Sequence, residues 1–95
     1  MLETDLRNTD LNLLIVLHSL LHTRSVTKTA GRLNMSQPAV SRALAKLRAT
    51  FDDKLFVKAA GGMLPTTRAQ ELMAPLATSL DVLHDLFARP EFDPA

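Results

Sequence analysis

The chain has 95 residues, of which 46% are hydrophobic and only 4% aromatic, and its formal net charge is +1. A chain of this length can close one small hydrophobic core, and a core made mostly of Leu, Ala, Val and Met argues against an all-β fold. The absence of cysteine excludes disulfides, thiolate zinc sites and cysteine nucleophiles, and the lack of a long apolar run or basic leader indicates a soluble, cytoplasmic protein that enters no membrane.

The first predicted helix covers residues 10–23, and either Thr9 or Asp10 can cap its N-terminus. Its apolar residues recur at helical spacing and comprise Leu13, Leu14, Leu17, Leu20 and Leu21. Ile15 and Val16 add apolar surface on a second face. Because a helix that is apolar on several sides needs several covering surfaces, we expect the domain core on one side and a second chain on another.

Two shorter helices joined by a tight turn follow. The first covers residues 26–34 with Ser25 as its N-cap. The second covers residues 36–51, where Ser36 is the N-cap and Pro38 lies in the first turn, at which a missing N–H costs little. Their core-facing residues are Val26, Ala30 and Leu33 in the first and Val40, Leu44, Leu47 and Phe51 in the second. This pair is typical of a helix-turn-helix.

The pattern then changes from helical to strand-like. Residues 55–58 and 62–65 are two short strand-like segments, and the turn between them contains glycines, which permit positive φ. They predict a two-stranded hairpin, or wing. The sequence therefore predicts a mainly α fold in which residues 1–65 form a winged helix-turn-helix domain of three helices plus the wing.

A long final helix is predicted over residues 66–90, with Thr66 or Thr67 as its N-cap and Pro75 as the site of a kink. Its apolar stripe consists of Ala69, Leu72, Leu76, Leu80, Leu83 and Phe87. Together with the apolar first helix, this stripe exceeds what a monomer of this size can bury, so we interpret the final helix as a linker and dimerisation helix. We assign to the dimer seam Val16, Leu72, Leu76, Leu80, Leu83 and Phe87.

Charge is distributed unevenly along the chain. Nine basic and two acidic residues lie between Arg24 and Arg68, whereas residues 1–23 and 69–95 each carry net negative charge. Such a concentration of basic residues is typical of a surface that faces a polyanion. The alternative is a solvated basic face with no partner.

The second helix of the helix-turn-helix carries side chains suited to reading DNA. On its outward side we expect Pro38, Arg42, Ala45, Lys46 and Ala49, with Ser41 on the flank and Gln37 at the N-terminal tip. Gln can pair with adenine, Arg with guanine, and Ser with a base or a phosphate, while alanines allow close approach. An ordinary exposed helix face would carry Glu as well as Lys, yet no acidic residue occurs from Ser36 to Thr50.

The run from Ser36 to Ser41, Ser-Gln-Pro-Ala-Val-Ser, and the later Leu55-Phe56-Val57-Lys58 closely resemble the N-terminal domain of LysR-type transcriptional regulators. The resemblance extends over about residues 10–87. It implies sequence-specific binding of an inverted-repeat DNA site by a homodimer, with a tetramer in the full-length protein. It also implies that no cofactor or metal is needed and that the chain is not an enzyme.

The resemblance also assigns roles to individual residues. Base edges are expected to meet Gln37, Pro38, Ser41 and Arg42, and phosphates to meet Thr27 and Ser36. Lys46 lies on the same outward face, and Lys58 on the wing is expected in the flanking minor groove. Family members continue into an effector-sensing domain, so we expect residues 91–95 to begin a hinge to a small-molecule-binding domain that this chain lacks.

Three departures from the family pattern limit these expectations. The wing turn reads Ala59-Ala60-Gly61-Gly62 without further basic residues, so the minor-groove contact rests on Lys58 alone. The final helix opens with Pro65-Thr66-Thr67-Arg68-Ala69, whereas the family usually has Leu-Thr-x-x-Gly there, so its N-cap residue is not fixed by the resemblance. Gly31 stands where alanine is common, which should loosen its helix by about 1 kcal/mol.

Two other classes of function remain as alternatives. His18 and His22 lie four residues apart, a spacing that can present two imidazoles to one metal ion in an enzyme, but the sequence offers no third ligand. The basic middle of the chain could instead meet an acidic protein in a helical interaction module. A salt titration with duplex DNA separates that module from a DNA-binding domain.

Overall fold

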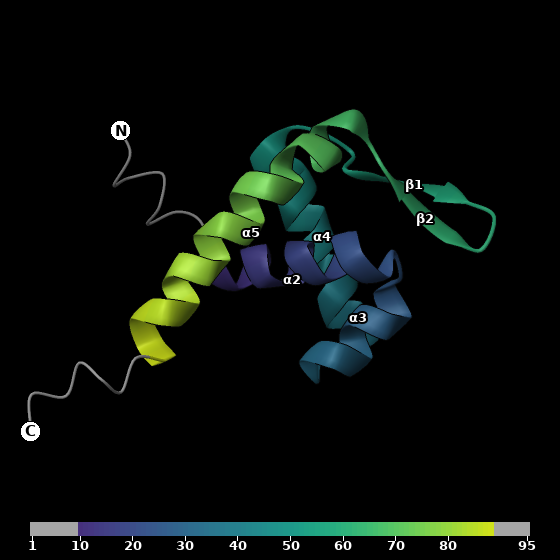
Figure 1. Ribbon diagram of the computed structural model, residues 1–95. Coiled ribbons are helices and arrows are strands. Elements are labelled where there is room, and N and C mark those ends of the chain that lie inside the picture. Colours follow the sequence, from purple (N-terminus) through teal and green to yellow (C-terminus); the bar gives the residue numbers. More distant parts are fainter. Residues whose placement is uncertain (1–9, 89–95) are drawn as a thin grey trace, which may run out of the picture.

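The computed structural model describes residues 10–88, which form four helices and a two-stranded hairpin (Figure 1). In chain order these are α2 (Leu11–Thr23), α3 (Val26–Leu33), α4 (Gln37–Phe51), β1 (Phe56–Ala59), β2 (Gly62–Pro65) and α5 (Thr67–Ala88). The mainly α winged helix-turn-helix followed by a long helix is thus confirmed. Thr9, the predicted end of the final helix at residues 89–90 and the predicted hinge at residues 91–95 lie outside the described residues.

Local hydrogen bonds explain where the helices begin. Each predicted capping side chain accepts a backbone N–H from the first turn, which satisfies a donor that the helix itself leaves unpaired. The pairs are Asp10 Oδ1 with Asn12 N (2.9 Å), Ser25 Oγ with Lys28 N (3.1 Å) and Ser36 Oγ with Ala39 N (3.1 Å). Of the two predicted N-cap residues of α5, Thr66 and Thr67, the structure shows Thr66 in this role, because its Oγ1 accepts a hydrogen bond from Ala69 N at 3.2 Å.

Left-handed residues end the first three of these helices. They are Arg24, Asn34 and Asp52, with φ values of 54°, 55° and 50°. Each donates its backbone N–H back to the last helical turn, which satisfies carbonyls left free at the helix end. α5, in contrast, continues through Pro75 to Ala88.

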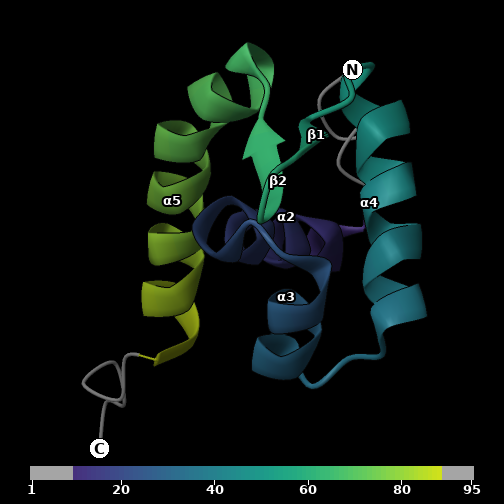
Figure 2. The same cartoon turned by 90° about the vertical axis from the view of Figure 1, so that its right-hand side faces the viewer.

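The core is built around α2, which packs against α3, α4 and α5 (Figure 2). Its buried apolar side chains are Leu13, Val16, Leu17, Leu20 and Leu21 from α2, Ala30 from α3, Val40, Ala43, Leu44 and Leu47 from α4, Leu55 and Phe56 at the wing base, and Ala69 and Leu76 from α5. Val16 and Leu76 were predicted at the dimer seam, but they are 3% and 7% exposed in the core of a single chain. That part of the seam prediction is wrong, because the chain's own core already covers both side chains.

A hydroxyl cluster joins α2 to α3 within this core. Thr29 is fully buried, and its Oγ1 lies 3.3 Å from Ser19 Oγ and 2.8 Å from Thr23 Oγ1. Thr23 Oγ1 in turn donates to the carbonyl of Ser25 at 3.1 Å. The cluster pairs its buried polar groups and fixes the helix-turn-helix on α2. No helix within residues 10–88 is both long and apolar enough to span a bilayer.

Candidate nucleic-acid interface

The turn between α3 and α4 fixes which face of α4 is exposed. Met35 donates its N–H to the carbonyl of Ala30 at 2.9 Å, and Ser36 then caps α4. The buried side of α4 carries Val40, Ala43, Leu44 and Leu47, as its apolar spacing predicted, with Phe51 half-buried at the end. The opposite side of α4 is therefore free to meet a partner.

The structure places all the predicted α4 site residues on this solvent-accessible side. They are Ser36, Gln37, Pro38, Ser41, Arg42 and Lys46, each of which is exposed. Ser36 Oγ accepts a hydrogen bond from its own helix, so its hydroxyl proton stays available to a phosphate oxygen. Because α4 contains no acidic residue, the surface is positive and rich in donors.

Thr27 and Lys58 lie on other elements. Thr27 is exposed in the first turn of α3, so it adds a hydroxyl close to a second helix N-terminus. Lys58 is exposed on β1, separate from α4, and its cross-strand neighbour is Met63. The site therefore has two parts, a helix face and a wing, which would have to meet different stretches of an extended ligand.

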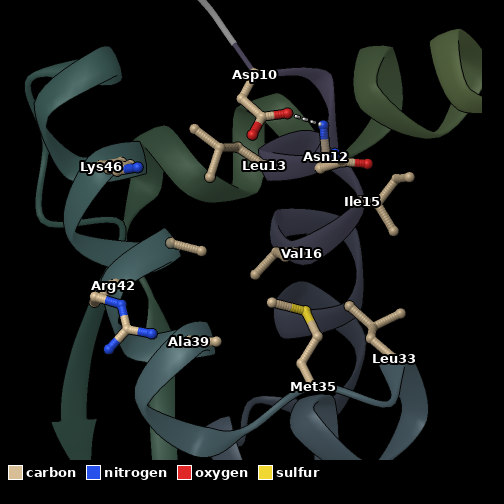
Figure 3. A pocket seen from close by; sticks show the side chains of 11 residues that line it. Asp10, Asn12, Leu13, Ile15, Val16, Leu33, Met35, Ala39, Arg42 and Lys46 are labelled. Atoms are coloured by element: carbon tan, nitrogen blue, oxygen red, sulfur yellow. Dashed lines mark hydrogen bonds between the residues drawn. The ribbon is translucent and has the colours of Figure 1, made fainter.

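A pocket of about 460 Å³ opens between the start of α2 and α4 (Figure 3). Figure 3 shows Arg42 and Lys46 along the α4 side, with Leu13 and Val16 of α2 across the gap. Asp10 supplies the only carboxylate among the lining residues, and its Oδ1 already caps α2. The described lining of the pocket thus combines apolar surface with two cations.

The two histidines predicted as possible metal ligands lie together on α2. Their ring centroids are 4.4 Å apart, and His22 Nδ1 is 2.9 Å from the carbonyl oxygen of His18. Partial burial is the main cause that lowers the pKa of His18, and the nearby His22 and Arg32 lower it further. Within residues 10–88 there is no group of three or more His, Asp or Glu side chains that could hold a metal ion.

The wing is a short antiparallel hairpin. Phe56 is buried at its base and pairs with Pro65, while Ala59 pairs with Gly62 at the tip. Strand β1 begins at Phe56, one residue later than predicted. The reason is that Leu55 is buried with a φ of +63°, which extended backbone does not adopt.

Gly62 lets the wing approach the turn that follows α2 more closely than a residue with a Cβ could. Its φ is +151°, and a Cβ at this position would lie 2.9 Å from the carbonyl oxygen of Arg24. We expect Gly62→Ala to lower the free energy of unfolding by about 1–2 kcal/mol, since both the backbone and the contact oppose a side chain. Chemical denaturation measures this loss. Gly61→Ala is the matched control, because Gly61 also has positive φ (+81°) but has open space around it. Equal losses in the two variants would show that the Arg24 contact is unimportant.

Sequence reasoning missed two residues that hold the wing base. Arg48 donates from Nε to the Lys54 carbonyl (2.7 Å) and from Nη2 to the Phe56 carbonyl (3.1 Å). Asp53 Oδ2 accepts from the Leu55 N–H (2.8 Å) and the Thr66 hydroxyl (2.7 Å), and these two hydrogen bonds lower the pKa of Asp53. The Asp53–Leu55 spacing is a turn signal that the sequence does carry. The Arg48 contacts have no such local signal.

An apolar groove of about 520 Å³ lies between the start of α2 and the second half of α5. Its lining residues are Leu11, Ile15, Leu80, Leu83, His84, Leu86 and Phe87. Phe87 is 86% exposed and Leu86 is 64% exposed, while Leu83 is half-buried. The remaining predicted seam residue, Leu72, is half-buried and packs against the core. Among the described residues, exposed apolar side chains thus gather at the start of α2 and the C-terminal half of α5, and a second exposed pair, Val57 and Leu64, lies on the wing.

Comparison with known families identifies this fold. Residues 11–70 match the family described as bacterial regulatory helix-turn-helix protein, lysR family. The chain belongs to the LysR family. It therefore carries the helix-turn-helix, DNA-binding domain of this family of regulators and is not an enzyme, and the predicted resemblance is confirmed.

Individual LysR-type relatives agree with this assignment. Nodulation protein D 2 of Bradyrhizobium sp. (strain NC92) is 46% identical over 87 residues, which are 90% of this chain and 26% of that protein. The crystal structure of a probable transcriptional regulator from Pseudomonas aeruginosa superposes with a TM-score of 0.81 at 41% identity, covering 86% of this chain and 28% of that one. The chain thus spans about a quarter of the length of these relatives.

A third LysR-fold neighbour was solved with DNA. BenM DBD in complex with catB site 1 DNA superposes with a TM-score of 0.76 at 19% identity, covering 82% of this chain and 88% of that one. At this identity the likeness establishes the common fold. It shows that the present chain is similar in its architecture to a domain that was solved in complex with DNA.

Proposed function

We propose that this chain binds an inverted-repeat DNA site as a homodimer, with α4 in the major groove and the wing in the flanking minor groove. One observation carries the proposal: α4 exposes an acid-free face whose donors gather near its N-terminus, where Gln37, Ser41 and Arg42 lie. A helix that enters the major groove contacts base edges from that end. BenM DBD, which shares this fold, was solved in complex with DNA, and this supports duplex DNA as the ligand.

Phosphate contacts would fix α4 in the groove. Thr27 and Ser36 stand at the N-termini of α3 and α4, where free backbone N–H groups and the helix dipole favour an anion. Lys46 lies one turn beyond Arg42 on the exposed side of α4 and adds a positive charge. Because such contacts release counterions, log K for duplex DNA should fall linearly with log salt. A salt-independent affinity would contradict the proposal.

The wing contact rests on Lys58, which is exposed on β1. We expect Lys58→Ala to weaken binding most, by roughly 1 kcal/mol, where A·T-rich sequence flanks the half-site, because a narrow minor groove concentrates negative potential on an inserted cation. Fluorescence anisotropy with A·T-rich and G·C-rich flanks measures the difference. Lys54→Ala removes the same charge at the wing base and is the matched control, with a loss that does not depend on the flank. If Lys58→Ala lowers the affinity equally for both kinds of flank, the wing does not enter the minor groove.

The dimer is proposed from the exposed groove on α5. Leu11 and Ile15 of α2 and Phe87 of α5 present apolar side chains there that a single chain leaves in solvent. A second copy related by a two-fold axis would cover this surface and would set two α4 helices in successive major grooves. On this proposal residues 66–90 are the linker and dimerisation helix of the regulator, and residues 1–65 are its DNA-binding domain.

A further inference from the structure

Arg48 belongs to the helix that would read the DNA, yet its guanidinium is bonded to the wing. Two different nitrogens of the group donate to two carbonyls, Nε to Lys54 at 2.7 Å and Nη2 to Phe56 at 3.1 Å. A planar guanidinium with donors in a fixed fork can hold both acceptors at once, which a lysine ammonium cannot do with the same rigidity. This side chain therefore links α4 directly to the first residues of β1.

The two carbonyls that Arg48 holds belong to a rigid segment. Between them, Leu55 is fully buried with a φ of +63°, and the Phe56 N–H donates to the Lys54 carbonyl at 2.6 Å. Phe56 is itself 1% exposed. If the Arg48 guanidinium moved, the start of β1 would therefore move with it, because the segment that it bonds to is not a flexible loop.

Lys58 is two residues beyond Phe56 on the same strand. Because side chains alternate along a strand, Phe56 and Lys58 lie on the same face of the hairpin. Phe56 points into the core and anchors that face, while Lys58 projects from its exposed end. The fork thus acts on the strand that places the Lys58 ammonium.

We propose that Arg48 is a positioning residue that sets where the wing lies relative to α4, so that Lys58 can reach the minor groove while α4 occupies the major groove. Arg48 need not touch DNA for this role. Asp53 bonds to Thr66, the N-cap of α5, and Gly62 allows the wing to approach the turn after α2 closely, whereas Arg48 bonds the reading helix itself to the start of β1. The inference rests on the proposed function, because it assumes that Lys58 contacts DNA.

A double-mutant cycle between Arg48 and Lys58 tests this role. The variants are Arg48→Met, Arg48→Lys, Lys58→Ala and the two combinations with Lys58→Ala, each measured on A·T-rich and G·C-rich flanks. Met keeps the length of the side chain but removes both bonds, and Lys keeps the charge but not the fork. We expect Arg48→Met to reduce the preference for A·T-rich flanks roughly twofold to fivefold, at most the loss expected for Lys58→Ala, and Arg48→Lys to restore it only in part.

The decisive comparison is made in the Lys58→Ala background. There, Arg48→Met should change neither the affinity nor the slope of log K against log salt, because the contact that Arg48 positions is already gone. A further drop in affinity, with a slope reduced by about 1, would make Arg48 a phosphate contact and overturn the inference. Thermal unfolding of each variant checks that the domain is folded. If Arg48→Met does not fold, the same comparison is made with Arg48→Lys.

The two proposals fail in different ways. If Lys58→Ala removes the flank preference but Arg48→Met and Arg48→Lys leave it intact, the inference about Arg48 is wrong and the wing contact stands. If Lys58→Ala has no flank-dependent effect in the otherwise unchanged chain, the wing contact is wrong, and the role of Arg48 falls with it.

Discussion

Replacing Arg42 by alanine is expected to weaken binding to the specific DNA site by about 1–3 kcal/mol and to relax base preference at one position in each half-site. Arg42 is exposed on α4, and α4 has no acidic residue to compete for its guanidinium. Two parallel hydrogen bonds to guanine account for a loss of this size, and no other base in the major groove offers the same pair of acceptors. Affinities for a panel of single-base variants of the site measure both effects.

Lys46→Ala is the matched control for Arg42→Ala. Lys46 lies four residues further along the helix, is also exposed and carries the same charge. If Lys46 contacts a phosphate, Lys46→Ala should weaken binding to all sequences alike and should reduce the slope of log K against log salt concentration by about 1. If Arg42→Ala behaves in the same way, with equal losses on specific and random DNA, Arg42 is also a phosphate contact and the proposed base readout is wrong.

Leu83→Asp is expected to convert the chain from a dimer to a monomer and to lower DNA affinity by about a hundredfold or more, because the two half-sites are then bound independently. Leu83 lines the apolar groove on α5, so the substitution would place two like charges at a symmetric seam. Leu80 is the less suitable site, since it also packs against the core of its own chain. Sedimentation at micromolar concentration gives the mass, and circular dichroism checks that the fold is retained.

Thr78→Asp controls for the added charge. Thr78 is exposed on the same helix but does not line the groove, and helical spacing places it on the side of α5 away from Leu83. This variant should remain a dimer with nearly unchanged affinity. A monomer mass for the unsubstituted chain, together with full affinity for a single half-site, would contradict the seam.

The parts of the fold that depend on near neighbours in the sequence could be predicted. Ser25 and Ser36 each cap a helix through an N–H three residues later, so their role is visible in the sequence. The same holds for the buried stripe of α4, because α4 is an amphipathic helix and packs against both α2 and α3. The exposed positions of Gln37 and Arg42 then follow directly from the helical period.

Features that depend on distant parts of the chain could not be predicted. Apolar periodicity predicts that Val16 and Leu76 are buried, but it does not say against which surface. In the structure both are buried in the chain's own core. Arg48 bonds to backbone carbonyls six and eight residues away, and Asp53 to a hydroxyl thirteen residues away, so neither contact leaves a pattern in the sequence. The DNA-contact roles of the α3, α4 and wing residues, Lys58 included, and the remaining seam residues stay predictions.

The most direct test of the account is selection of bound sequences from a random duplex pool by the unsubstituted chain. Binding of two α4 helices related by a two-fold axis predicts that the enriched sequences share an interrupted inverted repeat, with half-site centres about one helical turn or a multiple of it apart. They should also show A·T enrichment in the flanks that Lys58 would reach. A pool without an enriched motif, or with one unpaired half-site, would contradict the account.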